Sequence, residues 1–183
     1  MQITELSLPG AKLLRPPSHG DDRGSLTEVW NRDKFTALGV PDIFVQDNWT
    51  ISKRGALRGM HYQIGPASHA KLIRCAKGRI YDVIVDIRKS SPTFGQAIGV
   101  ELGEDPMQML LVPVGFAHGF LTLSDEAWIS YKLTHAYSAL YERGIQALDP
   151  KLLLQWPIAA TECVQSAKDQ ELPLLNQQPD LFL

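Results

Sequence analysis

Hydrophobic and polar residues alternate in short runs through most of the chain, and Gly, Pro, Ser and Asp separate the runs. Arg79 to Arg88, RIYDVIVDIR, is the clearest run, because β-branched and aromatic residues dominate it. Many short alternating runs at close spacing are typical of an antiparallel sandwich or barrel. The pattern predicts strands over 43–52, 56–63, 70–76, 79–88, 95–102, 107–112, 117–123 and 127–133.

Before residue 43 the sequence predicts shorter helices and strands than in the rest of the chain. A polar turn is expected over 18–24, and a short helix, capped by Asn31 or Asp33, is expected to end by Leu38. Three further short strands are predicted, over 1–10, 11–17 and 25–30.

The C-terminal part differs from the rest, because the alternation fades after Tyr137 and prolines interrupt segment 138–183. This segment predicts a short helix and loops. A tail of this length must pack on the barrel, and it can close over the barrel's mouth. We therefore expect one all-β domain over 1–183, a jelly-roll barrel or sandwich with a small helical and loop appendage at its C-terminus.

Composition narrows the class of protein. The chain has 183 residues, of which 44% are hydrophobic and 21% charged, as in an ordinary soluble globular domain. A formal net charge of -2 offers no basic field for nucleic acid, although it permits a local cationic pocket for a small anion. No signal peptide and no apolar run of about 20 residues is found, so we expect a cytoplasmic protein without membrane association. The chain has two cysteines, Cys75 and Cys163, which are too few and too far apart for a disulfide framework or a zinc site, so we expect both to be reduced thiols.

The stretch VQDNWTISKRGALRGMHYQ, residues 45–63, carries the first candidate chemistry. His61 and Gln63 share one face of a strand, because side chains two apart point the same way. Arg58 has the opposite parity, and it reaches the same space only if Gly59 or a bulge re-aims the strand. Two interpretations stay open: these side chains converge on one ligand inside a barrel, or they are ordinary polar residues of a surface strand.

A second histidine raises the question of a metal. His118 lies in VPVGFAHGF, which resembles half of a metal-binding cupin signature. The other half needs two histidines and a carboxylate, whereas the matching stretch here reads His61-Tyr62-Gln63. The ligand count therefore does not favour a metal site, and a lone histidine in such a place is more often structural.

Other candidates are unremarkable when taken singly. Lys71 begins the strand KLIRC, where a solvent-facing lysine is the ordinary interpretation. Tyr131 and Tyr137 fit core aromatics with a hydrated hydroxyl, and Asp169 fits a helix cap or a solvated loop carboxylate.

Together these residues fall into blocks that resemble the dTDP-4-dehydrorhamnose 3,5-epimerase family. The resemblance covers about Gly10 to Leu175 and is specific, because separated blocks must agree in order and spacing. The blocks are Asp22-Arg23-Gly24 with Glu28, QDNWTIS, GALRGMHYQ, AKLIRC, GRIYDVIVDIRKSSPTFG, VPVGFAHGF, YKLTHAY with Glu142, LDP with QWP, and SAKD.

The resemblance implies a cupin-type jelly roll that forms a homodimer and uses neither a metal nor an organic cofactor. It implies that His61 is the general base, that Asp169 orients it, that Lys71 stabilises an enolate and that Tyr131 donates a proton on the opposite face. It places Tyr137 against the nucleotide base. The remaining positions that match substrate-contacting residues are Arg23, Glu28, Gln46, Asp47, Asn48, Arg58, His118, Glu142 and Lys168.

The expected activity follows from the resemblance and from carbonyl chemistry. A 4-keto sugar acidifies the hydrogens on carbons 3 and 5, so a base, a cation beside the oxyanion and a second acid suffice for inversion. We expect a 3,5-epimerase of a nucleotide-linked 4-keto-6-deoxyhexose, such as dTDP-4-dehydro-6-deoxyglucose, that supplies deoxysugar for a surface polysaccharide or a glycosylated metabolite. The alternatives are an epimerase of one centre or of another nucleotide sugar, a metal-dependent cupin, and a non-catalytic sugar-binding jelly roll.

Overall fold

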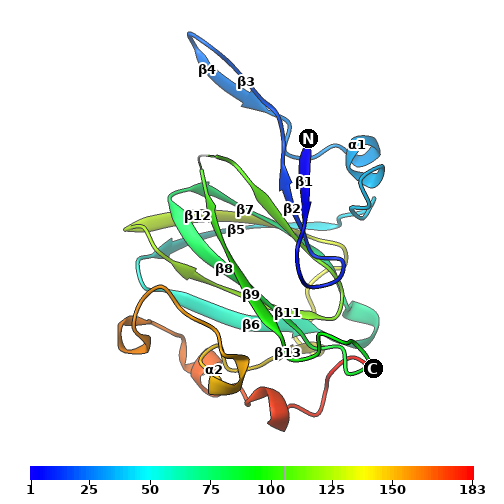
Figure 1. Cartoon of the computed structure of the whole chain (residues 1–183), viewed down its shortest axis with the longest axis vertical. Helices are drawn as coiled ribbons and strands as arrows, with labels where there is room; N and C mark the ends of the chain where they lie inside the picture. Colours follow the sequence, from blue (N-terminus) through cyan, green and yellow to red (C-terminus); the bar gives the residue numbers. More distant parts are fainter. Residues whose placement is uncertain (105) are drawn as a thin grey trace.

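Two antiparallel sheets face each other and enclose the main core (Figure 1). The structure is a computed structural model that describes residues 1–104 and 106–183. The six-stranded sheet has the order β1 (Gln2–Glu5), β2 (Lys12–Arg15), β10 (Met109–Val112), β7 (Lys71–Lys77), β12 (Glu126–Leu133) and β5 (Gln46–Lys53). The five-stranded sheet has the order β13 (Glu142–Gly144), β6 (Leu57–Gln63), β11 (Phe116–Thr122), β8 (Arg79–Asp86) and β9 (Ala97–Gly103).

The predicted all-β jelly roll is confirmed. Each of the eight strands predicted between residues 43 and 133 is present, with ends that differ by at most three residues. The short strand β13 was not predicted. Three residues are too few for a pattern, and the pairing of Glu142 with Gln63 and of Gly144 with His61 holds the strand against β6.

Alternation along the strands fills the space between the sheets. Ile73, Ile129, Ile84 and Phe120 point inward from strands of both sheets and are at most 5% exposed. Full burial of one such side chain stabilises the fold by about 1.5–3 kcal/mol. The inward face of the strands becomes polar toward one end of the barrel, where the candidate site lies.

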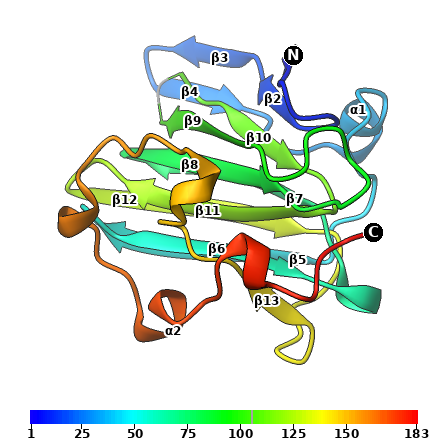
Figure 2. The ribbon, with the colours of Figure 1, turned by 60° about the horizontal axis from the view of Figure 1, so that its bottom comes forward.

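The C-terminal tail packs on the barrel, as expected. It runs along the outer face of the five-stranded sheet (Figure 2), where Leu152 and Leu175 join Tyr62 and Val85 in a second buried cluster. The tail contains the short α-helix α2 (Ala167–Gln170) and three 3-10 helices, Pro150–Leu152, Ala160–Glu162 and Leu175–Gln177. Most of the tail covers the sheet, while Glu142 of β13 and the region of α2 reach the mouth of the barrel.

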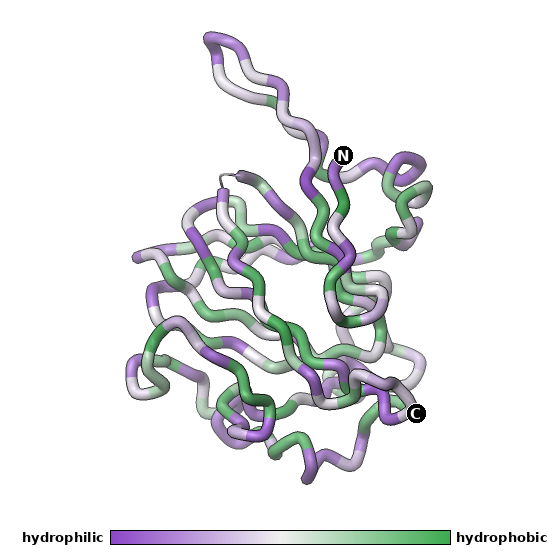
Figure 3. Tube along the Cα trace, viewed as in Figure 1, coloured by the Kyte–Doolittle hydropathy of each residue, from purple (hydrophilic) through white to green (hydrophobic). Residues whose placement is uncertain are grey.

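The prediction of a polar turn over 18–24 is wrong. Strands β3 (Ser18–Asp21) and β4 (Gly24–Thr27) form a hairpin that projects from the barrel (Figure 1) and is largely hydrophilic (Figure 3). The strand predicted over 25–30 therefore starts at Gly24 and ends at Thr27. The hairpin's residues are mostly exposed, so no buried face imposes alternation on its sequence.

The helix predicted after Asn31 is confirmed as α1 (Arg32–Thr36), and Asn31 caps it by accepting a hydrogen bond from Lys34 N at 3.2 Å. Phe35 of this helix packs with Leu14 and Leu72 on the outer face of the six-stranded sheet. Among the described residues, helices are short, and none has the length and apolar character of a membrane span.

Candidate active site

Strand β6 changes the direction of its side chains at Gly59. Leu57 and Met60 point into the outer cluster beneath the tail, whereas Arg58 and His61 line a cavity between the sheets. The pairing with β11 shifts at this point, because His118 is opposite His61 but Phe120 is opposite Arg58. The bulge brings Arg58 and His61 to the same cavity, although their positions along a regular strand would place them on opposite faces.

Only glycine fits at the turning point. Gly59 has φ +102°, and a Cβ built on it would lie 2.7 Å from the His118 carbonyl oxygen. Across the pair, a Cβ on Gly119 would lie 2.4 Å from the Arg58 carbonyl oxygen. The two glycines therefore let β6 and β11 approach closely enough to form the bulge.

His61 and Asp169 form a hydrogen-bonded pair. The ring Nε2 of His61 lies 2.8 Å from Asp169 Oδ1, and Gly59 N donates to Asp169 Oδ2 at 3.2 Å. Burial works to raise the pKa of Asp169, but the bonds from His61 and Gly59 outweigh it and leave that pKa below its ordinary value. An ionised carboxylate only accepts, so it holds the proton on Nε2 of His61. Ser166, the N-cap of α2, helps to fix the carboxylate's place.

Lys71 faces His61 from the opposite sheet. Its side chain is buried, and Nζ donates to the His61 carbonyl oxygen at 3.1 Å. Burial lowers the pKa of Lys71 from 10.5 to about 8, and the charges of Asp82 and Glu142 limit the fall. The side chain therefore carries a positive charge at neutral pH in a place from which most water is excluded.

Tyr131 comes from β12, next to β5. Its register partner is Asn48, and the inward side chains of Asn48 and Thr50 lie beside it. Burial raises the pKa of Tyr131, while hydrogen bonding with Thr50 and Asn48 opposes the rise. The phenol therefore stays protonated at neutral pH.

Two adjoining cavities, of about 300 and 290 Å³, share His61, Lys71 and Tyr131. The first is completed by Gln46, Asn48, Tyr62, Gln63, His69, Leu133, Tyr137 and Glu142. The second is completed by Thr50, Arg58, His118, Gly119, Phe120, Ser166, Lys168 and Asp169. Together they are large enough for a sugar joined to a second group, and the residues shared between them lie at the junction.

Three polar side chains cross the mouth of the first cavity. Glu142 Oε2 accepts from Lys168 Nζ at 2.5 Å and from the Tyr137 hydroxyl at 2.8 Å. Burial works to raise the pKa of Glu142, but these two partners outweigh it and lower that pKa. Tyr137 is 51% exposed, so its ring offers a free face at the entrance.

His118 is buried and uses one ring nitrogen inside the protein. Its Nε2 lies 2.9 Å from Asp82 Oδ1, and burial lowers its pKa despite the nearby charge of Asp82. Nowhere in residues 1–104 and 106–183 do three or more His, Cys, Asp or Glu side chains gather in a way that would hold a metal ion.

The structure brings most of the predicted residues to the two cavities but leaves three elsewhere. Arg23 lies on the projecting hairpin, bonded to Asp21, and Glu28 follows the hairpin and pairs with Lys34. Asp47 points to the outer face of the six-stranded sheet, where it binds Lys132 Nζ at 2.6 Å.

The residues at or behind the site that were not predicted include Thr50, His69, Phe120 and Asp82. Thr50 could have been found, because it continues the inward parity of Gln46 and Asn48 on one strand. Burial lowers the pKa of His69 to about 3, so it stays neutral beside Lys71.

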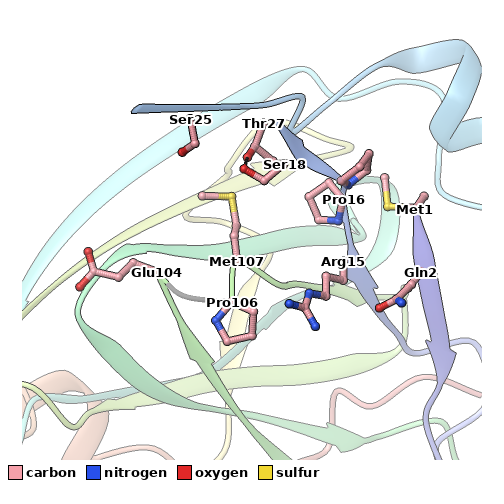
Figure 4. Close-up of a pocket in the computed structure, with 11 residues that line it drawn as sticks. Met1, Gln2, Arg15, Pro16, Ser18, Ser25, Thr27, Glu104, Pro106 and Met107 are labelled. Atoms are coloured by element: carbon pink, nitrogen blue, oxygen red, sulfur yellow. Dashed lines mark hydrogen bonds between the residues drawn. The ribbon is translucent and has the colours of Figure 1, made fainter. Parts of the chain in front are cut away.

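A larger cavity, of about 740 Å³, lies at the base of the hairpin and contains none of the predicted residues. Figure 4 shows Arg15 from β2 inside it, with Glu104 and Met107 on the other side and Thr27 above. Prolines and small polar residues form most of its described lining.

Comparison with known proteins gives one family. The family model described as dTDP-4-dehydrorhamnose 3,5-epimerase matches residues 5–177. The dTDP-4-dehydrorhamnose 3,5-epimerase of Salmonella typhimurium is 44% identical over 97% of each chain.

Two solved structures are similar in fold and sequence. The Bacillus anthracis dTDP-4-dehydrorhamnose 3,5-epimerase, solved with TDP and PPi bound, has a TM-score of 0.91 and 45% identity over 94% of this chain and 98% of its own. A Legionella pneumophila epimerase in complex with dTDP-4-keto-L-rhamnose has a TM-score of 0.92 and 40% identity, covering 96% and 93%.

Proposed function

This chain belongs to the dTDP-4-dehydrorhamnose 3,5-epimerase family, and we propose that it inverts carbons 3 and 5 of dTDP-4-dehydro-6-deoxy-D-glucose. The product is then dTDP-4-dehydro-L-rhamnose. The observation that carries the proposal is the meeting of His61, Lys71 and Tyr131 at the junction of two cavities, with Asp169 behind the histidine. Conversion of this nucleotide sugar, with inversion at both carbons read by proton NMR, tests it. A product inverted at carbon 3 alone, or unchanged substrate, contradicts it.

His61 is the proposed base. Asp169 keeps the proton on Nε2, so Nδ1 has the free lone pair that takes a proton from carbon 3 or carbon 5. The imidazolium that forms is stabilised by the same carboxylate, because an opposite charge 2.8 Å away favours the charged ring.

Lys71 is the proposed stabiliser of the enolate. When the proton leaves, negative charge moves onto the oxygen of carbon 4, and a buried ammonium beside that oxygen lowers the barrier. The charge is fixed in place before the reaction, because the His61 carbonyl holds Nζ at 3.1 Å. None of these steps calls for a metal or an organic cofactor, so we propose that activity survives treatment with a chelator.

Tyr131 is the proposed proton donor on the face opposite His61. Inversion requires that the new proton arrive from that face, and a protonated phenol supplies it. We expect Tyr131→Phe to take up deuterium from heavy water with little inversion, because His61 can still remove and return a proton on its own side.

Mass spectrometry and NMR of the recovered sugar together separate exchange from inversion. Leu133→Ile, a change of similar volume in the lining of the first cavity, is the matched control and should still invert. Full inversion by Tyr131→Phe would contradict the role of the phenol.

The nucleotide is proposed to lie in the first cavity, beside Tyr137. The exposed tyrosine ring suits stacking on a base, Gln46 and Asn48 supply polar contacts in the same cavity, and Arg58 lines the second cavity. A guanidinium such as that of Arg58 fits the oxygens of a diphosphate. His118, Glu142 and Lys168 are the remaining proposed contacts within the cavities.

We further propose that the active form is a homodimer. Arg23 and Glu28 match substrate-contacting positions of the family, yet they lie on or beside the hairpin that projects from the barrel (Figure 1). Both facts are compatible if the hairpin of one copy reaches the cavity of the other. Asp47 contacts substrate in this proposal through its backbone, since its side chain faces away. The cytoplasmic location and the role in deoxysugar supply stay predictions from the family resemblance.

Substitution of Arg23 tests the dimer. We expect Arg23→Ala to raise KM about tenfold or more with little change in kcat, because one charge-assisted contact to the nucleotide is lost. The matched control is Arg79→Ala, which removes another exposed arginine, from its surface pair with Glu101. Light scattering should give the mass of two chains. A fully active monomer, or an unchanged KM in Arg23→Ala, would contradict this proposal.

A further inference from the structure

A second buried carboxylate lies behind the proposed site. Asp82 of β8 is 0% exposed, between Ile80 and Ile84 on the inward face of its strand. Its Oδ1 accepts from His118 Nε2 at 2.9 Å. Within the part of the chain that the structure describes, its Oδ2 has no hydrogen-bond partner. A buried polar atom without a partner is costly and uncommon in native structures, so its retention calls for a reason.

The position of Asp82 follows from the pairing of β8, β11 and β6. His118 is opposite His61 on one side, and on the other side Asp82 is two positions from the partner of His118. Diagonal neighbours on one face of adjacent strands are within reach of each other's side chains. The five-stranded sheet therefore carries a row of three polar side chains on adjacent strands, from the carboxylate of Asp82 through His118 to His61, the proposed base.

Lys71 completes the cluster from the opposite sheet. The titratable and charged groups around it are His61 and Arg58 of β6, Asp82 of β8, His118 of β11, Tyr131 of β12, Glu142 of β13, Lys168 and Asp169 of α2, and His69. Asp82 is fully buried, whereas Glu142 already binds Lys168 and Tyr137 at the mouth. Asp82 is thus the anion of this cluster that water screens least.

We infer that Asp82 is a positioning residue for the epimerisation: its charge keeps Lys71 in the ammonium form, and its Oδ1 fixes the ring of His118 at the cavity wall. The inference rests on the proposed role of Lys71 and adds a residue that acts through Lys71 and His118 without touching the sugar. Because the carboxylate accepts the Nε2 proton of His118, the other ring nitrogen is left as an acceptor for a substrate hydroxyl.

The charge of Asp82 has a measurable consequence for pH dependence. The pKa of Lys71 is about 8, and burial alone would place it lower. Activity that needs the ammonium should be lost as the pH rises through about 8. Removing the buried anion should move this loss to lower pH, since Asp82 is the larger of the two negative charges that support the ammonium form and only that of Glu142 remains.

The experiment is a pH profile of kcat and of kcat/KM for Asp82→Asn, which keeps the shape and removes the charge. We expect the alkaline limb of kcat to move down by about one pH unit or more, with part of the lost activity recovered in acid. Thr122→Val is the matched control, because Thr122 is 0% exposed on β11 and its hydroxyl also has no partner among the described residues. The alkaline limb of kcat for Thr122→Val should lie at the same pH as that of the unsubstituted protein.

An alkaline limb that stays in place in Asp82→Asn overturns the inference, whether the rate is full or uniformly reduced. If Asp82→Asn does not fold, Asp82→Val removes the same charge with a side chain that suits a buried strand, and the same shift is expected. Lys71→Met distinguishes a failure of the proposed role of Lys71 from a failure of the inference about Asp82. Full activity in that variant contradicts the proposed role of Lys71, whereas its inactivity together with an unmoved limb in Asp82→Asn contradicts only the role of Asp82.

Discussion

His61→Asn is expected to lower kcat by about 10²–10⁴-fold, the usual contribution of a general base. Asp169 keeps its bond from Gly59 N in the variant, so the buried carboxylate still has a partner and the fold is expected to survive. The variant has no group that can take the proton from carbon 3 or carbon 5. Substrate binding should change little, because the nucleotide contacts lie elsewhere in the cavities.

Steady-state kinetics and deuterium uptake measure the effect of His61→Asn. His135→Asn is the matched control, since His135 is exposed and its Nδ1 lies near the Ala136 carbonyl outside both cavities. Circular dichroism verifies the fold of both variants. If His61→Asn kept more than about a tenth of the activity, His61 would not be the base.

Lys71→Met is expected to lower kcat by about 10²–10³-fold, the effect of removing one group that stabilises an oxyanion. The same change should make the protein more stable at neutral pH. Burial places the pKa of Lys71 near 8 in the folded chain against 10.5 when exposed, so the folded state carries an unfavourable charge. At 1.36 kcal/mol per pKa unit this is a gain of about 3 kcal/mol at most.

The stability of the protein should depend on pH, because Lys71 holds its proton less tightly in the folded chain than in the unfolded chain. Below about pH 8 Lys71 is charged in the folded and the unfolded chain, and its full penalty applies. Between about 8 and 10.5 the unfolded chain binds more protons, so the unsubstituted protein gains stability as the pH rises through this window. Lys71→Met should lack this gain.

Urea unfolding at several pH values measures both effects. Lys77→Met is the matched control, because Lys77 is on the same strand but is exposed and pairs with Glu126. Full activity in Lys71→Met, or a loss of stability, would contradict the assignment. Activity that is lost while stability is gained is expected of a residue kept for function.

Much of the fold follows from local patterns. The strands that face the main core alternate, because one side of each is buried, and this made β5 to β12 visible in the sequence. The hairpin β3–β4 was missed because neither of its faces is buried in this chain. The short helix predicted in the tail is present as α2, whereas the 3-10 helices and β13 depend on packing against β6 and its neighbours, which no short stretch of sequence encodes.

The candidate site divides in the same way. His61 with Gln63, and Gln46 with Asn48, are pairs on one strand, so parity alone brings each pair to one face. The change of direction that brings Arg58 to His61 depends on Gly59. The sequence showed only that such a change was needed, and the bulge in the structure provides it.

Contacts over long sequence distances required more than local patterns. Asp169 is 108 residues from His61, and only the family resemblance connected them. Asp82 left a local trace that was not used, a carboxylate at an inward position between Ile80 and Ile84.

The most direct measurement is incubation with dTDP-4-dehydro-6-deoxyglucose in deuterium oxide, followed by mass spectrometry of the recovered sugar. Abstraction and return of protons at carbons 3 and 5 predicts two deuterons per molecule, and none when His61→Asn is used. One deuteron would mean that the chain exchanges a proton at a single centre, and no deuterium from the unsubstituted protein would contradict enolate chemistry on this substrate.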